Sequence, residues 1–161
     1  MCIIVDTNVA HKFTQPPDEA VKPVIDWLLS KKQSNQLAVG GRLRKELFRS
    51  GEPFRRLYLQ LDRVGRIANV SDELVNADEK EVAALLESLG LVADDEHVLA
   101  LARVCGSRLL ASEDSSSGLH AHFKDKRIVN PPGSIYQNAT HRHLLKKCPP
   151  CKVKKLARRA K

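Results

Sequence analysis

Four acidic residues from distant parts of the chain have positions suited to a metal site: Asp6, Glu46, Asp95 and Asp114. Asp6 directly follows the short apolar run 2–5, and Asp114 comes shortly after a second predicted strand at 108–111. In an open parallel sheet, a strand that ends on a carboxylate directs it towards the carboxyl edge, where ligands bind. Carboxylates that gather without matching cations are typical of a divalent-metal site. The sequence therefore predicts one metal centre at that edge.

Taken singly, each acid also has a simpler explanation. Asp95 opens a predicted helix at its N-terminus and would stabilise it by about 0.5–2 kcal/mol as a capping residue. Asp114 would cap the turn after its strand, and Glu46 would be a surface residue of a helix. The combination of the four residues, and not any one of them, favours the metal site.

The elements that must position these residues alternate between strands and helices. Apolar runs predict strands at 2–5, 36–39, 66–70, 108–111 and 127–129. Helical periodicity predicts helices at 18–32, 42–49, 53–64, 77–89, 94–105 and 135–147, with a helical turn at 119–123. This alternation predicts an α/β fold, a three-layer α/β/α sandwich with a mainly parallel central sheet.

The domain organisation follows from length and charge. The 161 residues suffice for one domain with a core, and we assign it residues 1–147. A basic tail at 148–161 follows, beginning with the sequence Cys-Pro-Pro-Cys. Residues 146–161 hold eight Lys and Arg and no acid, leaving 19 basic against 19 acidic residues in the rest of the chain. The net charge of +8 therefore arises from the C-terminal end.

Several short motifs, in their order and spacing, resemble those of the PIN-domain family. They are Val5–Val9, Arg44–Leu47, Asp94–Ala102 and Arg108–Asp114. The resemblance covers roughly residues 1–130. It implies a compact α/β/α nuclease that acts on RNA and holds Mg²⁺ or Mn²⁺ with Asp6, Glu46, Asp95 and Asp114. It favours Asp95 over its neighbour Asp94, and makes Asn8 and Ser112 supporting residues or minor ligands.

Basic residues beside the acids and in the tail form the predicted RNA-binding set: Arg42, Arg44, Lys45, Lys152, Lys154, Lys155, Arg158 and Arg159. Such residues bind polyanions through phosphate contacts and counterion release, without reading sequence. Aromatic residues make up only 4% of the chain, so base stacking is not a strong feature. The alternatives are the solvated faces of helices and a solvated terminus.

The histidines and cysteines allow several interpretations. His141, His143, Cys148 and Cys151 are a possible zinc group, although reduced cysteines in a flexible tail are the simpler prediction. A redox pair is a third possibility. His120 and His122 are expected in a loop or on the surface. His97 is expected to point away from Asp95, because residues two apart on a helix do not share a face.

These observations predict a metal-dependent endoribonuclease, of toxin type or acting in RNA processing. The alternative is a non-catalytic RNA-binding or assembly module with the same fold. An antitoxin or other protein partner is possible, and the resemblance alone implies a homodimer. The chain has no glycine-rich P-loop, no dinucleotide fingerprint and no apolar stretch of membrane-spanning length. Together with an N-terminus that directly enters a strand, this predicts a cytoplasmic protein.

Overall fold

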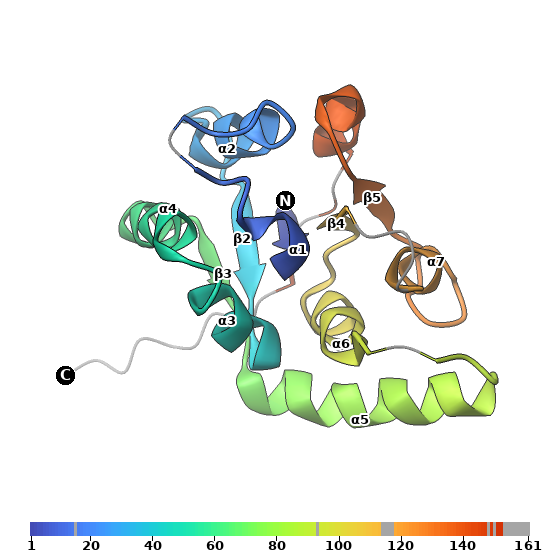
Figure 1. Ribbon diagram of the computed structural model, residues 1–161. Coiled ribbons are helices and arrows are strands. Elements are labelled where there is room, and N and C mark those ends of the chain that lie inside the picture. The colour runs from blue at the N-terminus through green and yellow to red at the C-terminus, as the bar shows by residue number, and fades with distance from the viewer. Residues whose placement is uncertain (15, 93, 114–117, 148, 150, 153–161) are drawn as a thin grey trace.

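The computed structural model describes residues 1–161 apart from 15, 93, 114–117, 148, 150 and 153–161. Five strands form one sheet: β1 (Cys2–Val5), β2 (Gln36–Val39), β3 (Ile67–Asn69), β4 (Leu109–Ala111) and β5 (Ser134–Tyr136). Their order across the sheet is β3-β2-β1-β4-β5, and every pairing is parallel (Figure 1). The predicted α/β class with a parallel sheet is thus confirmed.

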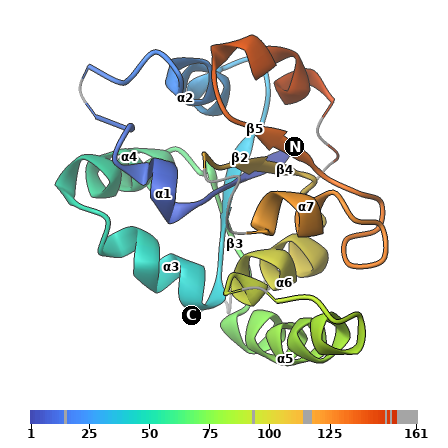
Figure 2. The same cartoon turned by 45° about the vertical axis from the view of Figure 1, so that its right-hand side comes forward.

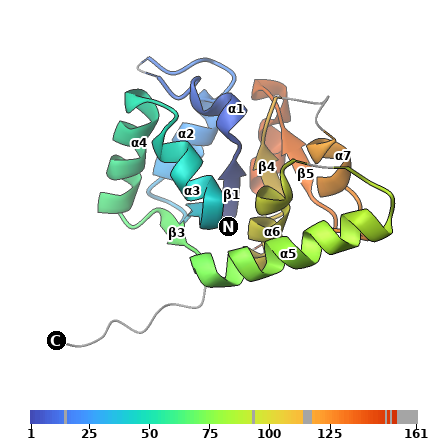
Figure 3. The same cartoon turned by 60° about the horizontal axis from the view of Figure 1, so that its bottom comes forward.

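Helices enclose the sheet from both sides, as a parallel sheet requires. They are α1 (Thr7–Ala10), α2 (Lys22–Leu29), α3 (Gly41–Phe48), α4 (Glu52–Arg63), α5 (Asp72–Ser88), α6 (Glu96–Cys105), α7 (Leu119–Phe123) and the 3₁₀ helix η1 (Ala139–Lys146). Figure 2 shows α2 and η1 on one side of the sheet, with α6 and α7 on the other. The long helix α5 packs along α6 at the outside of the molecule (Figure 3). None of the described helices combines the length and apolar character needed to cross a bilayer.

The strand order creates a switch point between β1 and β4. From β1 the chain moves to β2 and β3 on one side, then crosses over through α5 and α6 to β4 and β5 on the other. Ile4 pairs with Leu110, and Val5 pairs with Ala111, so the two strands end together. In open parallel sheets, ligands bind outside the carboxyl ends of strands at such a point.

The core is continuous around the central strand. All four residues of β1 have no exposed surface, and α6 buries seven of its ten residues. A helix this apolar is stable only between other layers, here the sheet and α5. Burying each large apolar side chain contributes about 1.5–3 kcal/mol, so β1 and α6 are the best anchored elements of the fold.

The predicted strand at 127–129 is wrong, and the fifth strand is β5. The backbone N–H groups of Ile128 and Val129 both donate to the carbonyl of Asp125, at 2.9 Å, which curls this run into a turn. The side chains of Ile128 and Val129 are nevertheless buried, which explains the misleading apolar pattern. The predicted helix at 135–147 is a shorter 3₁₀ helix. The helix predicted at 77–89 begins earlier, where Ser71 accepts a hydrogen bond from the Leu74 amide.

Candidate metal centre at the carboxyl edge of the sheet

Asp6 lies at the switch point. Its backbone N–H donates to the carbonyl of Ala111 at 2.9 Å, which ties the end of β1 to the end of β4. The side chain is 8% exposed, and its Oδ2 accepts a hydrogen bond from Ser112 Oγ at 3.0 Å. A longer hydrogen bond, at 3.5 Å, runs from Thr7 Oγ1 to Asp6 Oδ1. A nearly buried carboxylate with both oxygens hydrogen-bonded is held in one direction. It therefore has the fixed position that a ligand-binding group requires.

Ser112 connects three segments around this carboxylate. Its single hydroxyl hydrogen is donated to Asp6, so its lone pairs accept from Asn8 Nδ2 at 3.4 Å and from His120 Nε2 at 2.9 Å. The Asn8 side chain in turn accepts from the Glu113 amide at 3.2 Å. Ser112 is fully buried, and this network fixes the Asp6 rotamer. The predicted supporting residues Asn8 and Ser112 are thus adjacent to Asp6.

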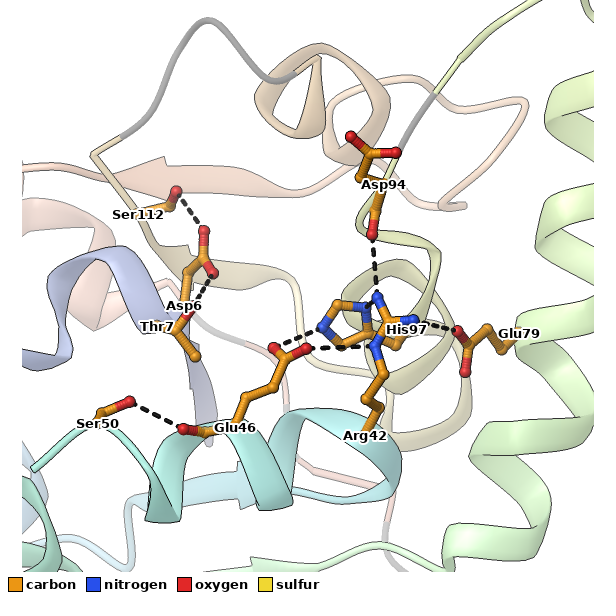
Figure 4. Close-up of polar contacts among 9 residues, drawn as sticks. All are labelled: Asp6, Thr7, Arg42, Glu46, Ser50, Glu79, Asp94, His97 and Ser112. Carbon is orange, nitrogen blue, oxygen red and sulfur yellow. Dashed lines mark hydrogen bonds and ion pairs between the residues drawn. The ribbon is translucent and has the colours of Figure 1, made fainter.

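Glu46 reaches the same region from the middle of α3. Its Oε2 is 3.0 Å from His97 Nε2, and its Oε1 is 3.2 Å from Arg42 Nε (Figure 4). Arg42 Nη2 also lies 2.7 Å from His97 Nδ1. Since Arg42 has only donors, His97 accepts at Nδ1 and donates from Nε2 to Glu46. In Figure 4 the Glu46 carboxylate turns to this pair, while that of Asp6 turns to Ser112.

Asp95 is the residue immediately before α6, but its side chain makes no capping hydrogen bond. Burial raises the pKa of this carboxyl, and the negative charges of Asp6, Asp94 and Glu46 raise it further, while His97 opposes them. The like charges show that acids from three elements act on one another here. Asp95 is therefore better explained as a member of the acidic group than as a helix cap.

The acids do not form a closed cage. A compact metal site needs at least three Asp, Glu, His or Cys side chains whose ligand atoms lie close together. In the described part of the chain, only Cys2, Cys105 and Cys151 form such a group, with all their ligand atoms within 4.8 Å of one another. Glu46 is engaged by Arg42, which also lies 3.5 Å from Glu79 and donates to the Asp94 carbonyl. The expectation of carboxylates without a matching cation is therefore wrong for Glu46. Asp114 lies outside the described residues.

The predicted RNA-binding residues have different surroundings. Arg44 pairs with Asp72 at 2.8 Å and donates to the Val70 carbonyl at 3.2 Å, so it links α3 to the start of α5. Arg42 is 48% exposed, and Lys45 and Lys152 are exposed. Lys154, Lys155, Arg158 and Arg159 lie outside the described residues. Arg42 and Lys45 are therefore the basic residues of α3 that remain accessible to a phosphate.

Three histidines differ from the sequence prediction. His97 was expected to point away from Asp95, and its imidazole is instead directed at Glu46, another member of the acidic group. His120 and His122 are buried in α7 instead of lying on the surface. The buried face of α6, on which only His97 is polar, was the available signal that its imidazole needs a polar partner.

Among the described members of the possible zinc group, the ligand atoms of His141, His143 and Cys151 do not gather. His141 Nδ1 accepts from the Gln137 amide at 3.1 Å, and His143 is exposed. Cys151 lies with Cys2 and Cys105 at the opposite edge of the sheet, so the interpretation as a cysteine in a flexible tail is wrong. Cys148 lies outside the described residues.

No family model, curated protein or solved structure matches this chain.

Proposed function

We propose that the chain is a metal-dependent endoribonuclease with a PIN-like active site at the carboxyl edge of its sheet. The observation that supports this most strongly is the position of Asp6, at the switch point between β1 and β4, with Asp95 and Glu46 close enough to act on one another's charge. Ligand sites in open α/β sheets lie at this point. Acidic groups drawn from β1, α3 and α6 there favour a cation as the ligand.

The donor set fits Mg²⁺ or Mn²⁺, which prefer carboxylate oxygens. Asp6, Glu46 and Asp95 would hold the ion, and Asp114 is a fourth candidate by sequence. Mutual repulsion and burial already make the charged form of Asp95 costly, and a cation would relieve that cost. A bound ion would lower the pKa of a coordinated water and polarise the phosphate.

The remaining residues would orient ligands and substrate. Ser112 and Asn8 hold the direction of Asp6, and His97 holds Glu46. Arg42, half exposed beside Glu46, can turn from its carboxylate to a phosphate oxygen, with Lys45 on the same helix. Such contacts position a nucleic acid without reading its bases. The preference for RNA, a toxin or RNA-processing role, an antitoxin partner and a homodimer rest on the resemblance.

Cleavage of a mixed RNA pool with Mn²⁺ or Mg²⁺ tests the proposal. We expect the intact chain to cleave, and excess chelator to abolish cleavage. Asp6→Asn keeps the shape of the side chain but removes its charge, and should lower the rate by more than about 100-fold, beyond the usual effect of a residue that only orients a ligand. Asp26→Asn, on the exposed face of α2, is the matched control. Full turnover in chelator, or by Asp6→Asn, would reject the proposal.

A non-catalytic RNA-binding module is the second candidate. It is favoured by the Arg42–Glu46 pair, which neutralises one acid without any metal. For this candidate we expect RNA to be retained in a gel-shift assay, equally by the intact chain and Asp6→Asn, with no cleavage under any metal condition.

A further inference from the structure

A group of three cysteines lies at the amino edge of the sheet, away from the acidic residues. Cys2 begins β1, Cys105 ends α6, and Cys151 belongs to the C-terminal segment. Their sulfur atoms all lie within 4.8 Å of one another. Cys2 and Cys105 are fully buried and Cys151 is half-buried. Because they come from both ends and the middle of the chain, only the completed fold brings them together.

The backbone around Cys105 is shaped to receive the C-terminal segment. Gly106 ends α6 in the left-handed conformation, at φ 77°, and a Cβ there would come within 3.2 Å of the Lys152 side chain. The Lys152 amide donates to the Cys105 carbonyl at 2.6 Å. This hydrogen bond and the close approach seat Cys151 against the end of α6. The segment after η1 is thus joined to the body of the domain at the cysteines.

Polar groups stabilise negative charge on one of the sulfurs. Hydrogen bonds from Cys151, Cys2 and the Ser107 amide lower the pKa of Cys105 to about 4, and the positive charge of Arg108 acts in the same direction. The Ser107 N–H lies 3.4 Å from this sulfur. The pKa of Cys2 is raised chiefly by its hydrogen bond to Cys105, and the same kind of bond raises that of Cys151 to about 12. Negative charge in this group is therefore favoured at Cys105.

We propose that Cys2, Cys105 and Cys151 bind one Zn²⁺ ion through their sulfur atoms. Tetrahedral zinc with bonds of about 2.3 Å places its sulfur ligands about 3.8 Å apart, so the observed grouping needs only a small contraction. Binding releases to solvent whatever protons the three thiols carry, and the resulting thiolates match a soft, borderline metal. A disulfide would use two of the sulfurs and leave the third buried beside it.

Metal analysis of the full chain, purified under reducing conditions without chelator, tests the proposal. We expect about one zinc per chain and, after exchange for Co²⁺, the intense thiolate-to-cobalt absorption of a sulfur site. Cys151→Ala should lose the zinc and the absorption, because it removes a half-buried ligand with little effect on the core. His143→Ala, an exposed member of the group suggested by sequence, should keep both.

Two further variants keep the result interpretable. Asp6→Asn should retain the zinc, which separates this site from the carboxylates, and the outcome does not depend on nuclease activity. Cys105→Ser should lose it, with circular dichroism to show that the variant is folded. Absence of zinc from the reduced, refolded chain after addition of one equivalent would overturn the proposal. So would a disulfide among the three cysteines, found by mass spectrometry in protein purified with thiols blocked, or zinc retained by Cys151→Ala.

Discussion

The two edges of one sheet carry opposite kinds of ligand. Hard oxygen donors, Asp6, Glu46 and Asp95, lie at the carboxyl edge, and soft sulfur donors lie at the amino edge. The same elements join them, since β1 begins at Cys2 and leads to Asp6, and α6 runs from the residue after Asp95 to Cys105. Four strand residues span about 13 Å and ten helical residues about 15 Å.

The two edges also differ in how deeply their ligand groups are buried and how closely these groups are held together. The sulfur group is mostly buried, with Cys151 half-buried, and backbone hydrogen bonds hold Cys105 at its sulfur and its carbonyl. The carboxylate group is partly open, and Glu46 forms an ion pair with Arg42. The ligand atoms of its described members do not all lie within 4.8 Å of one another. This difference is expected if one edge fixes the positions of β1 and α6 so that the other can accept a metal and a substrate.

The largest effect that separates the two edges is on stability. Removing zinc with a zinc-selective chelator should lower the free energy of unfolding by about 4 kcal/mol, the value for a ligand present at about 1,000 times its Kd. That corresponds to a fall in Tm of about 8–16 °C in a domain of this size. Removing Mg²⁺ alone should change Tm by a degree or two at most. Thermal unfolding followed by circular dichroism measures both, and equal shifts would contradict a division into structural and functional edges.

Ser112→Ala should act on the carboxyl edge alone. It removes the hydrogen bond to Asp6 Oδ2 and leaves His120 and Asn8 without their shared acceptor. We expect cleavage to fall by about 10–100-fold, as for other residues that orient metal ligands. RNA-cleavage rates against Mn²⁺ concentration measure the change. Ser88→Ala, at the exposed end of α5, is the control, and zinc content should be unaffected in both.

The raised pKa of Asp95 should affect how the free energy of unfolding depends on pH. Its folded pKa lies above 3.8, chiefly through burial, so the folded state binds this proton more tightly than the unfolded state. In metal-free protein, this group lowers stability as pH rises from about 3.8 through its folded pKa. Asp95→Asn should therefore stabilise the metal-free chain at neutral pH, and this gain should disappear towards about pH 4. Urea denaturation between about pH 4 and pH 7, with Asp26→Asn as control, tests this, and a loss of stability at neutral pH would contradict it.

The smallest effect is expected from Arg42→Gln. This substitution removes the positive charge that pairs with Glu46 and Glu79. The carboxylates at the carboxyl edge should then bind Mn²⁺ about 2–5-fold more tightly, because a partly exposed ion pair contributes a free energy of that size. Calorimetric titration of Mn²⁺ into the zinc-loaded chain measures this. Lys45→Gln, on the same helix, is the control, and weaker Mn²⁺ binding by Arg42→Gln would mean that the arginine holds Glu46 in place for the metal.

Local patterns predicted much of this fold because its central elements are buried on all sides. The runs at β1, β2 and β4, the helix at α6 and the alternation that makes the sheet parallel were all recognisable. Asp6 and Asp95 could be placed near the carboxyl edge from the sequence because each lies at the end of such an element. Strand β5 was missed because Ile128 and Val129 are as apolar as a strand but are held in a turn.

The contacts of His97 and the cysteine group were not predicted from the sequence, because both depend on residues far apart along the chain. The bonds from His97 to Glu46 and from Arg42 to His97 depend on how α3 packs on α6, and no spacing within either helix encodes them. The cysteines are 103 and 46 residues apart along the chain and meet only when the C-terminal segment returns to the sheet. Spacing instead suggested nearby histidines, which the fold directs elsewhere.

Anomalous X-ray scattering from a crystal of the full chain grown with Zn²⁺ and Mn²⁺ would test the division of the two edges most directly. Data collected at the zinc and manganese absorption edges distinguish the two metals at each site. We predict a zinc peak among Cys2, Cys105 and Cys151 and a separate manganese peak beside Asp6 and Asp95. A crystal without zinc at the cysteines, or with manganese bound away from the carboxylates, would contradict the account.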